Sequence, residues 1–117
     1  MTDVQERPWG AWKVVHQEGE GMLSRAVKVL TVNPGCMLSL QYHQRRAEFW
    51  VPLWDGLVAY NGDEATYLKA FEPYTVHRGS AHRLINPSSQ DISVVEIIAG
   101  EYDEEDIVRL HDAYGRV

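Results

Sequence analysis

The chain has 117 residues and a formal net charge of −6; 44% of the residues are hydrophobic and 24% are charged. This length fits one domain with one core, and the composition excludes an extensively disordered chain. The acidic balance argues against partners such as nucleic acid or an anionic membrane surface, because neither attracts an acidic protein at long range. Cys36 is the only cysteine, and residues 1–10 contain no apolar signal segment. We therefore expect a single cytoplasmic domain over residues 1–117, without a disulfide.

Short segments rich in valine, isoleucine, tryptophan and tyrosine alternate with turn residues, a rhythm typical of all-β sandwiches and barrels. In chain order, the predicted strands are residues 11–16, 25–32, 37–43, 48–53, 57–60, 65–68, 74–76, 82–85 and 92–99. Asn61-Gly62 is the strongest hairpin signal among the turns that separate them.

Only the end of the chain has a helical pattern. The acidic residues 103–106 suit a helix N-terminus, where the backbone dipoles stabilise negative charge. Ile107, Leu110 and Tyr114 would then share one face, and Gly115 could end the helix. The sequence therefore predicts a short C-terminal helix after the strands.

Four side chains form a candidate metal site. Gln41 and His43 are two residues apart in a predicted strand, so they share a face, and Glu48 follows shortly after. His82 begins a later strand that a barrel can bring alongside. Their oxygen and imidazole donors suit Zn²⁺, Mn²⁺, Fe²⁺, Co²⁺ or Ni²⁺, and zinc is our first choice. Each histidine alone would more often be structural, so the inference depends on the whole set.

The spacing of these residues resembles a known pattern. Gly35, Gln41, His43 and Glu48 resemble the first cupin motif, with glutamine in place of its first histidine. Gly79, His82 and Asn86 resemble the second motif. Further segments resemble the C-terminal domain of type II phosphomannose isomerases over practically the whole chain: Arg7-Pro8-Trp9-Gly10, Leu38-Ser39-Leu40-Gln41, Arg46-Ala47-Glu48, His82-Arg83-Leu84, Gly100-Glu101-Tyr102 and Asp112-Ala113-Tyr114-Gly115-Arg116.

The resemblance implies a cupin double-stranded β-helix, or jelly-roll barrel, that forms a homodimer and binds a phosphosugar. In that family the domain follows a mannose-1-phosphate guanylyltransferase domain on a longer polypeptide, and we expect no guanylyltransferase activity from these 117 residues. The Gln-x-His pair also resembles the zinc-binding pair of type I phosphomannose isomerases. The implied metal ligands are thus Gln41, His43, Glu48 and His82.

The implied reaction is the interconversion of mannose 6-phosphate and fructose 6-phosphate, which serves carbohydrate and polysaccharide precursor metabolism. Candidate proton-transfer residues are Glu96, His77 and Lys28, and candidate phosphate-binding residues are Arg46, Arg109 and Arg116. The chain departs from the type II pattern at Gln44, Arg45 and Phe49, where the family has histidines, and at His77, where the cupin motif has proline. Two alternatives stay open: a non-catalytic sugar or sugar-phosphate binding cupin, and another metal-cupin reaction such as that of a dioxygenase.

Overall fold

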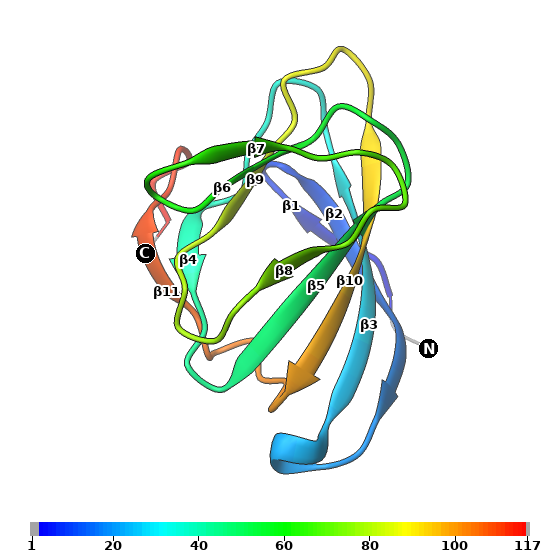
Figure 1. The fold of residues 1–117 in the computed structure, drawn as a ribbon, viewed down its shortest axis with the longest axis vertical. Helices are drawn as coiled ribbons and strands as arrows, with labels where there is room; N and C mark the ends of the chain where they lie inside the picture. Colours follow the sequence, from blue (N-terminus) through cyan, green and yellow to red (C-terminus); the bar gives the residue numbers. More distant parts are fainter. Residues whose placement is uncertain (1–2, 117) are drawn as a thin grey trace.

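The computed structural model describes residues 3–116 and is all-β, as predicted, with two facing layers of antiparallel strands (Figure 1). The larger layer is one sheet whose strand order is β1 (Gln5–Arg7), β2 (Gly10–Glu18), β3 (Arg25–Val32), β10 (Ile92–Gly100), β5 (Arg46–Pro52) and β8 (Tyr74–Val76). The facing layer holds β7 (Ala65–Tyr67), β6 (Val58–Tyr60), β9 (Arg83–Ile85), β4 (Leu40–Tyr42) and β11 (Val108–His111). Isolated bridges, Met37 to Ile85 and Gln41 to His82, join the segment containing β4 to the β9 edge.

Alternation of buried and less buried residues explains the central strands. Along β3, β5 and β10 every second side chain faces the interior, as the period of a strand requires. Apolar residues fill one end of the barrel, and each of these strands contributes to the core there. The core includes Trp9, Leu30, Val32, Trp50, Leu57, Leu84, Ile92 and Val94.

Polar residues interrupt this interior at one level. Glu96 on β10 lies opposite Lys28 on β3 and opposite Trp50 on β5. One step further along the same strands, Glu48 lies opposite Ile98. Because the strand period fixes these side chains on the inner face, the register places Lys28, Glu96 and Glu48 inside the barrel next to the apolar core.

All the predicted strands overlap observed ones, and residues 61–64 form the expected hairpin turn between β6 and β7. The Asn61 side chain accepts the amide protons of Asp63 and Glu64, and Gly62 has a φ of 103°. The short β1 and β11 were not predicted. Asn86, from the second motif, has a structural role, because its side-chain amide donates to the backbone oxygens of Val32 and Gln90.

The predicted C-terminal helix is wrong. Residues 108–111 instead form β11, in which Val108 pairs with Tyr42 and Arg109 pairs with Gln41. A short isolated helix nucleates poorly, whereas the edge of β4 offers unpaired backbone groups to a strand. Within residues 3–116 the one helical element is the 3-10 turn η1 (Gly21–Leu23), and no helix there has the length and apolarity to span a membrane.

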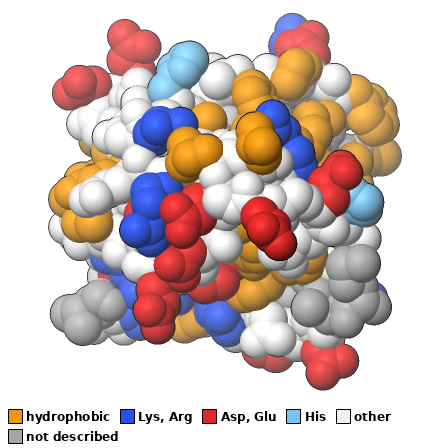
Figure 2. Space-filling view, turned by 90° about the horizontal axis from the view of Figure 1, so that it is seen from below, with side chains coloured by type: hydrophobic (Ala, Val, Ile, Leu, Met, Phe, Trp, Pro, Cys, Tyr) orange, Lys and Arg blue, Asp and Glu red, His pale blue; other side chains and the backbone are white. Residues whose placement is uncertain are grey.

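The segment between β10 and β11 crosses one end of the barrel. At Gly100 the backbone passes so close to the β4–β5 connection that a Cβ would lie 2.5 Å from the Arg45 backbone oxygen, and φ is 122°. Only glycine accepts both conditions without strain. The chain then returns over the interior, where Asp106 contacts residues 43–45. The face that includes this end carries interspersed acidic and basic side chains (Figure 2).

Candidate metal centre and pocket

The interior polar residues line a cavity of about 140 Å³. Three of its charged lining residues are acidic: Glu48, Glu96 and Glu104. Its basic lining residues are Arg7, Lys28, Arg46, Arg83, Arg109 and Arg116. This excess of cationic groups in a chain of net charge −6 favours an anionic ligand in the cavity.

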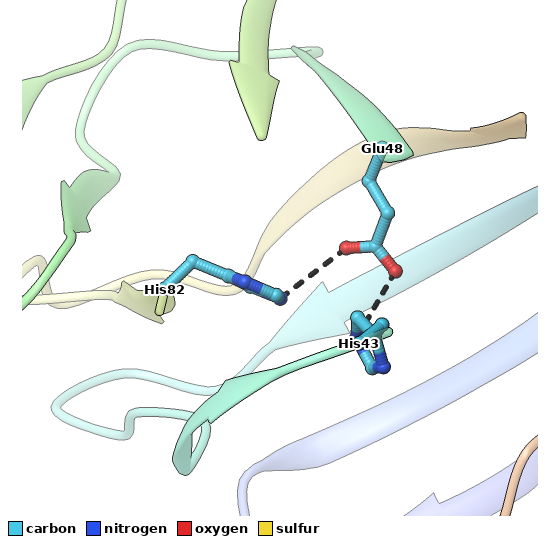
Figure 3. A group of neighbouring side chains, drawn as sticks. All are labelled: His43, Glu48 and His82. Atoms are coloured by element: carbon cyan, nitrogen blue, oxygen red, sulfur yellow. Dashed lines mark ion pairs between the residues drawn. The ribbon is translucent and has the colours of Figure 1, made fainter. Parts of the chain in front are cut away.

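His43, Glu48 and His82 form the predicted cluster inside this cavity. Their ligand atoms all lie within 4.8 Å of one another, and all three side chains are buried. Figure 3 shows the Glu48 carboxylate from β5 directed between the two imidazole rings. His43 Nε2 is 3.3 Å from Glu48 Oε2, and His82 Nε2 is 3.4 Å from Glu48 Oε1.

Backbone carbonyls orient both rings. His43 Nδ1 donates to the Asp106 oxygen at 2.5 Å, and His82 Nδ1 donates to the Ser80 oxygen at 3.0 Å. A neutral imidazole with its proton on Nδ1 has its lone pair on Nε2. Both Nε2 atoms therefore face Glu48, and each offers a lone pair there when its ring is neutral, which is how second-sphere carbonyls prepare histidines for a metal.

The surroundings shift the pKa values of the two histidines in opposite directions. Burial, with help from the Arg46 charge, lowers the pKa of His43 to about 4 despite the opposing Glu48 carboxylate. Burial also acts to lower the pKa of His82, but the adjacent Glu48 carboxylate outweighs it and the pKa of His82 is raised. For Glu48, burial alone would raise the carboxyl pKa, yet His82 and Arg46 together lower it. The Glu48 carboxylate is thus ionised at neutral pH, as a metal ligand must be.

These residues fit a divalent cation. Glu48 Oε1 is buried and has no hydrogen-bond partner among the described residues, which is costly for a carboxylate oxygen. Its separation from His82 Nε2 matches two ligands at roughly 2.0–2.2 Å from one ion. A cation would satisfy that oxygen and the lone pair of His82 Nε2. His43 Nε2, which accepts from Arg46 Nη2 at 3.2 Å, offers a third donor atom beside them, so this donor set suits a metal.

Gln41, the fourth predicted ligand, lies beside this cluster. It exchanges backbone hydrogen bonds with His82, and its side chain lines the same cavity. The side-chain Nε2 donates to Ser39 Oγ at 2.8 Å. With its nitrogen held there, the amide oxygen stays available as an acceptor, so coordination by Gln41 remains a prediction.

Arg46 also lies against the cluster. Its Nε donates to Glu48 Oε2 at 3.0 Å. Its Nη2 lies 2.8 Å from the same oxygen as an ion pair and donates a hydrogen bond to His43 Nε2 at 3.2 Å. The structure thus places Arg46 at the end of the cavity that contains the His43-Glu48-His82 cluster, with a buried guanidinium.

Glu96 and Lys28, two of the predicted proton-transfer residues, face the same cavity. Lys28 Nζ is 3.9 Å from Glu96 Oε1 and 3.1 Å from Glu104 Oε2, and it lies over the Trp12 ring. Trp50 Nε1 donates to Glu96 Oε2 at 3.0 Å. Burial, followed by the nearby Glu48 charge, raises the pKa of Glu96 to about 7, which suits a group that exchanges protons at neutral pH.

The other predicted residues are divided between two places. Arg109 and Arg116 line the cavity on the β11 side, and a bidentate ion pair with Asp112 holds the Arg116 guanidinium. His77 is exposed and borders a different hollow, with Tyr74 and Ser80. The structure therefore does not bring His77 together with Glu96 and Lys28.

Sequence reasoning missed several residues that line or support the cavity. Asp106 acts on His43 through its backbone oxygen, and its carboxylate accepts the Gln44 and Arg45 amide protons. Glu104 and Arg7 complete the cavity wall. No local signal marked Asp106, because its acidic neighbours suggested a helix start.

A two-layered antiparallel barrel with a histidine-glutamate cluster inside defines the cupin class. The Schizosaccharomyces pombe Cnp3 cupin domain has a similar fold, with a TM-score of 0.74 over 86% of this chain and 69% of that chain at 12% identity. The predicted cupin barrel is confirmed. Residues 2–112 match the family described as Mannose-6-phosphate isomerase C-terminal, and the chain belongs to that family.

Two bacterial proteins of polysaccharide biosynthesis are similar to this chain in sequence. The xanthan biosynthesis protein XanB of Xanthomonas campestris is 39% identical over 111 residues, which cover 94% of this chain and 23% of XanB. The alginate biosynthesis protein AlgA of Pseudomonas aeruginosa is 39% identical over 112 residues, which cover 94% of this chain and 22% of AlgA. The chain therefore spans less than a quarter of the length of these relatives.

Proposed function

We propose that this chain is a metal-dependent isomerase domain that interconverts mannose 6-phosphate and fructose 6-phosphate for polysaccharide precursor synthesis. The observation that carries the proposal is one cavity that contains both the His43-Glu48-His82 cluster and Glu96, a buried carboxyl with a pKa of about 7. The family and the biosynthetic relatives support it.

The reaction moves one proton between neighbouring carbons. The Glu96 carboxylate takes the C2 proton of open-chain mannose 6-phosphate, the C–H electron pair forms a C1–C2 double bond, and the carbonyl pair moves onto O1. Glu96 returns the proton to C1, while a proton passes from O2 to O1 and a carbonyl forms at C2. No atom is gained or lost, so this chemistry needs no further reactant.

Protein residues around Glu96 prepare it for this role. Lys28 lies 3.9 Å away and favours the ionised carboxyl, while burial favours the protonated one, so both forms are accessible near neutral pH. His43, Glu48, His82 and Gln41 would hold the metal, with zinc as first choice. When bound, a divalent cation supplies a Lewis acid that polarises the substrate carbonyl.

Two further arginines provide for the phosphate. Arg109 and Arg116 line the cavity on the β11 side, and planar guanidinium groups bind phosphate oxygens in pairs. Holding the phosphate there would fix C1 and C2 relative to Glu96, which is the main contribution of substrate positioning to rate.

The deciding experiment is metal analysis of the purified protein followed by a coupled assay with mannose 6-phosphate. We expect turnover that disappears on chelation and returns with Zn²⁺, Mn²⁺ or Co²⁺. Binding of mannose 6-phosphate without turnover under any of these metals would favour the non-catalytic sugar-phosphate cupin. Oxygen consumption that requires iron would instead indicate a dioxygenase.

The homodimer and the cytoplasmic location also remain predictions. Leu53, Trp54 and Phe71 are exposed apolar side chains on two connected loops, and the Phe71 amide donates to the Pro52 oxygen between them. Such a patch supports self-association. Analytical ultracentrifugation of the unaltered protein and of Trp54→Ser measures the degree of self-association directly.

A further inference from the structure

We propose that Arg46 is a catalytic residue that binds the oxyanion formed on the substrate during isomerisation, and that it does not bind the phosphate. The proposal rests on the proposed isomerase function and assigns a role to one donor atom within that site. Three observations carry it: the guanidinium is buried, two of its nitrogens contact Glu48, and the third nitrogen has no hydrogen-bond partner among the described residues.

Arg46 is held in one orientation. Only 5% of the residue is exposed, Nε donates to Glu48 Oε2, and Nη2 lies 2.8 Å from the same oxygen as an ion pair. Nη2 also lies 3.2 Å from His43 Nε2. Because two nitrogens are fixed on one carboxylate oxygen, the direction of the third nitrogen, Nη1, is fixed as well.

Nη1 has no partner. It is buried and makes no hydrogen bond with any of the described residues, although Arg46 lines the cavity. A buried guanidinium donor without a partner costs free energy that the fold must offset elsewhere. Neutralising Glu48 would not require this atom, since Nε and Nη2 already contact the carboxylate. A substrate oxygen in the cavity would satisfy it.

The position of Arg46 identifies which oxygen this is. The guanidinium contacts Glu48 and His43, so Nη1 lies at the metal-binding end, where C1 and C2 of the substrate must react. The phosphate is on C6, at the other end of the hexose, and the proposed function assigns it to Arg109 and Arg116. A fixed positive donor in a buried site stabilises a developing negative charge without reorganisation. Arg46 keeps all its protons and donates one hydrogen bond to O1 when the carbonyl electron pair moves there.

The test compares Arg46→Lys with a matched variant, Arg109→Lys, in metal-loaded protein. Lysine keeps the charge beside Glu48 and removes Nη1. We expect Arg46→Lys to retain the metal, to lower kcat for mannose 6-phosphate about 10²–10³-fold and to change KM by less than roughly threefold. Arg109→Lys should give the opposite division, a raised KM with a smaller change in kcat.

Binding measurements provide a readout that does not depend on turnover. Calorimetry would use two sugar phosphates: a hydroxamate analogue that resembles the enediolate, and a hexitol 6-phosphate that has the phosphate and no carbonyl. Arg46→Lys should weaken the hydroxamate about 10²-fold and leave the hexitol phosphate unchanged. Arg109→Lys should weaken both ligands by similar factors.

Three results would overturn the proposal. Equal weakening of both ligands by Arg46→Lys would make Arg46 a phosphate-binding residue. Loss of the metal in Arg46→Lys would show that it acts by holding Glu48, and unchanged kcat and binding would show that Nη1 meets no substrate. If the unaltered protein binds both ligands but turns over no mannose 6-phosphate, the isomerase assignment fails, and the ratio of the two affinities still decides the role of Arg46.

Discussion

His43 donates its Nδ1 proton to the backbone oxygen of Asp106, a residue 63 positions further along the chain. The Asp106 carboxylate meanwhile accepts the amide protons of Gln44 and Arg45 at 3.0 and 2.9 Å. One buried residue therefore fixes both the ring of a metal-ligand candidate and the loop that follows it.

Asp106→Ala should loosen this arrangement. Two amide donors would lose a charged acceptor, so we expect the free energy of unfolding to fall by about 2–4 kcal/mol. Metal affinity should fall roughly tenfold, because the loop that carries His43 is no longer held. Urea denaturation and metal competition titration measure the two effects. Exposed Glu105→Ala is the matched control and should change neither, and an Asp106→Ala variant with unaltered metal affinity would contradict the positioning role.

Gln41 can be tested by two substitutions that differ in donor chemistry. Gln41→Ala removes the amide oxygen and should lower metal affinity about 10–100-fold, with a circular dichroism spectrum like that of the unaltered protein. Gln41→His restores the histidine of the usual first cupin motif and should keep or raise the affinity. Elemental analysis after dialysis gives the metal content. Full occupancy in Gln41→Ala would remove this residue from the ligand set.

Glu96 should make the metal-free protein less stable as the pH rises. Its carboxyl pKa is about 7 in the folded state against 4.5 when unperturbed, so the folded state holds a proton that the unfolded state releases. The stabilisation from this proton is complete below pH 4.5 and is lost as the pH rises through 7. Glu96→Gln removes this loss. The free energy of unfolding of Glu96→Gln, relative to that of the unaltered protein, should therefore rise by on the order of 3 kcal/mol between pH 4.5 and 7. Above pH 7 this difference should stay constant.

Chemical denaturation of both proteins across this pH range provides the measurement. A difference between the two proteins that stays constant with pH would show that the Glu96 carboxyl titrates normally, and its proposed role as a base near neutral pH would lose its support.

Phe71 has a backbone conformation that its side chain does not favour. Its φ is 65°, and 72% of the residue is exposed. Asparagine tolerates this left-handed region better than phenylalanine, and little buried area would be lost, so Phe71→Asn should raise the free energy of unfolding by roughly 0.5–1 kcal/mol. Tyr67→Asn, at an exposed strand position, is the comparison and should lower it. A loss of stability in Phe71→Asn that depends on protein concentration would place Phe71 in a subunit interface.

The sequence by itself determined the strands from β2 to β10 and the faces of their side chains. Alternation with a period of two predicted that Gln41 and His43 share a face, and both line the cavity. The spacing to Glu48 and the position of His82 predicted the cluster, because these distances along the chain are characteristic of one barrel. Local periodicity and motif spacing suffice for such features.

Only the tertiary structure decided which distant groups meet. Residues 108–111 pair with the edge of β4 as a strand, although their sequence pattern suggested a helix. This pairing brings Arg109 beside Gln41. The same return of the chain placed the Asp106 backbone oxygen against the His43 ring. Local sequence fixes the face on which a side chain lies, whereas its partner depends on strand register and chain crossings, which are set by contacts far apart in the sequence.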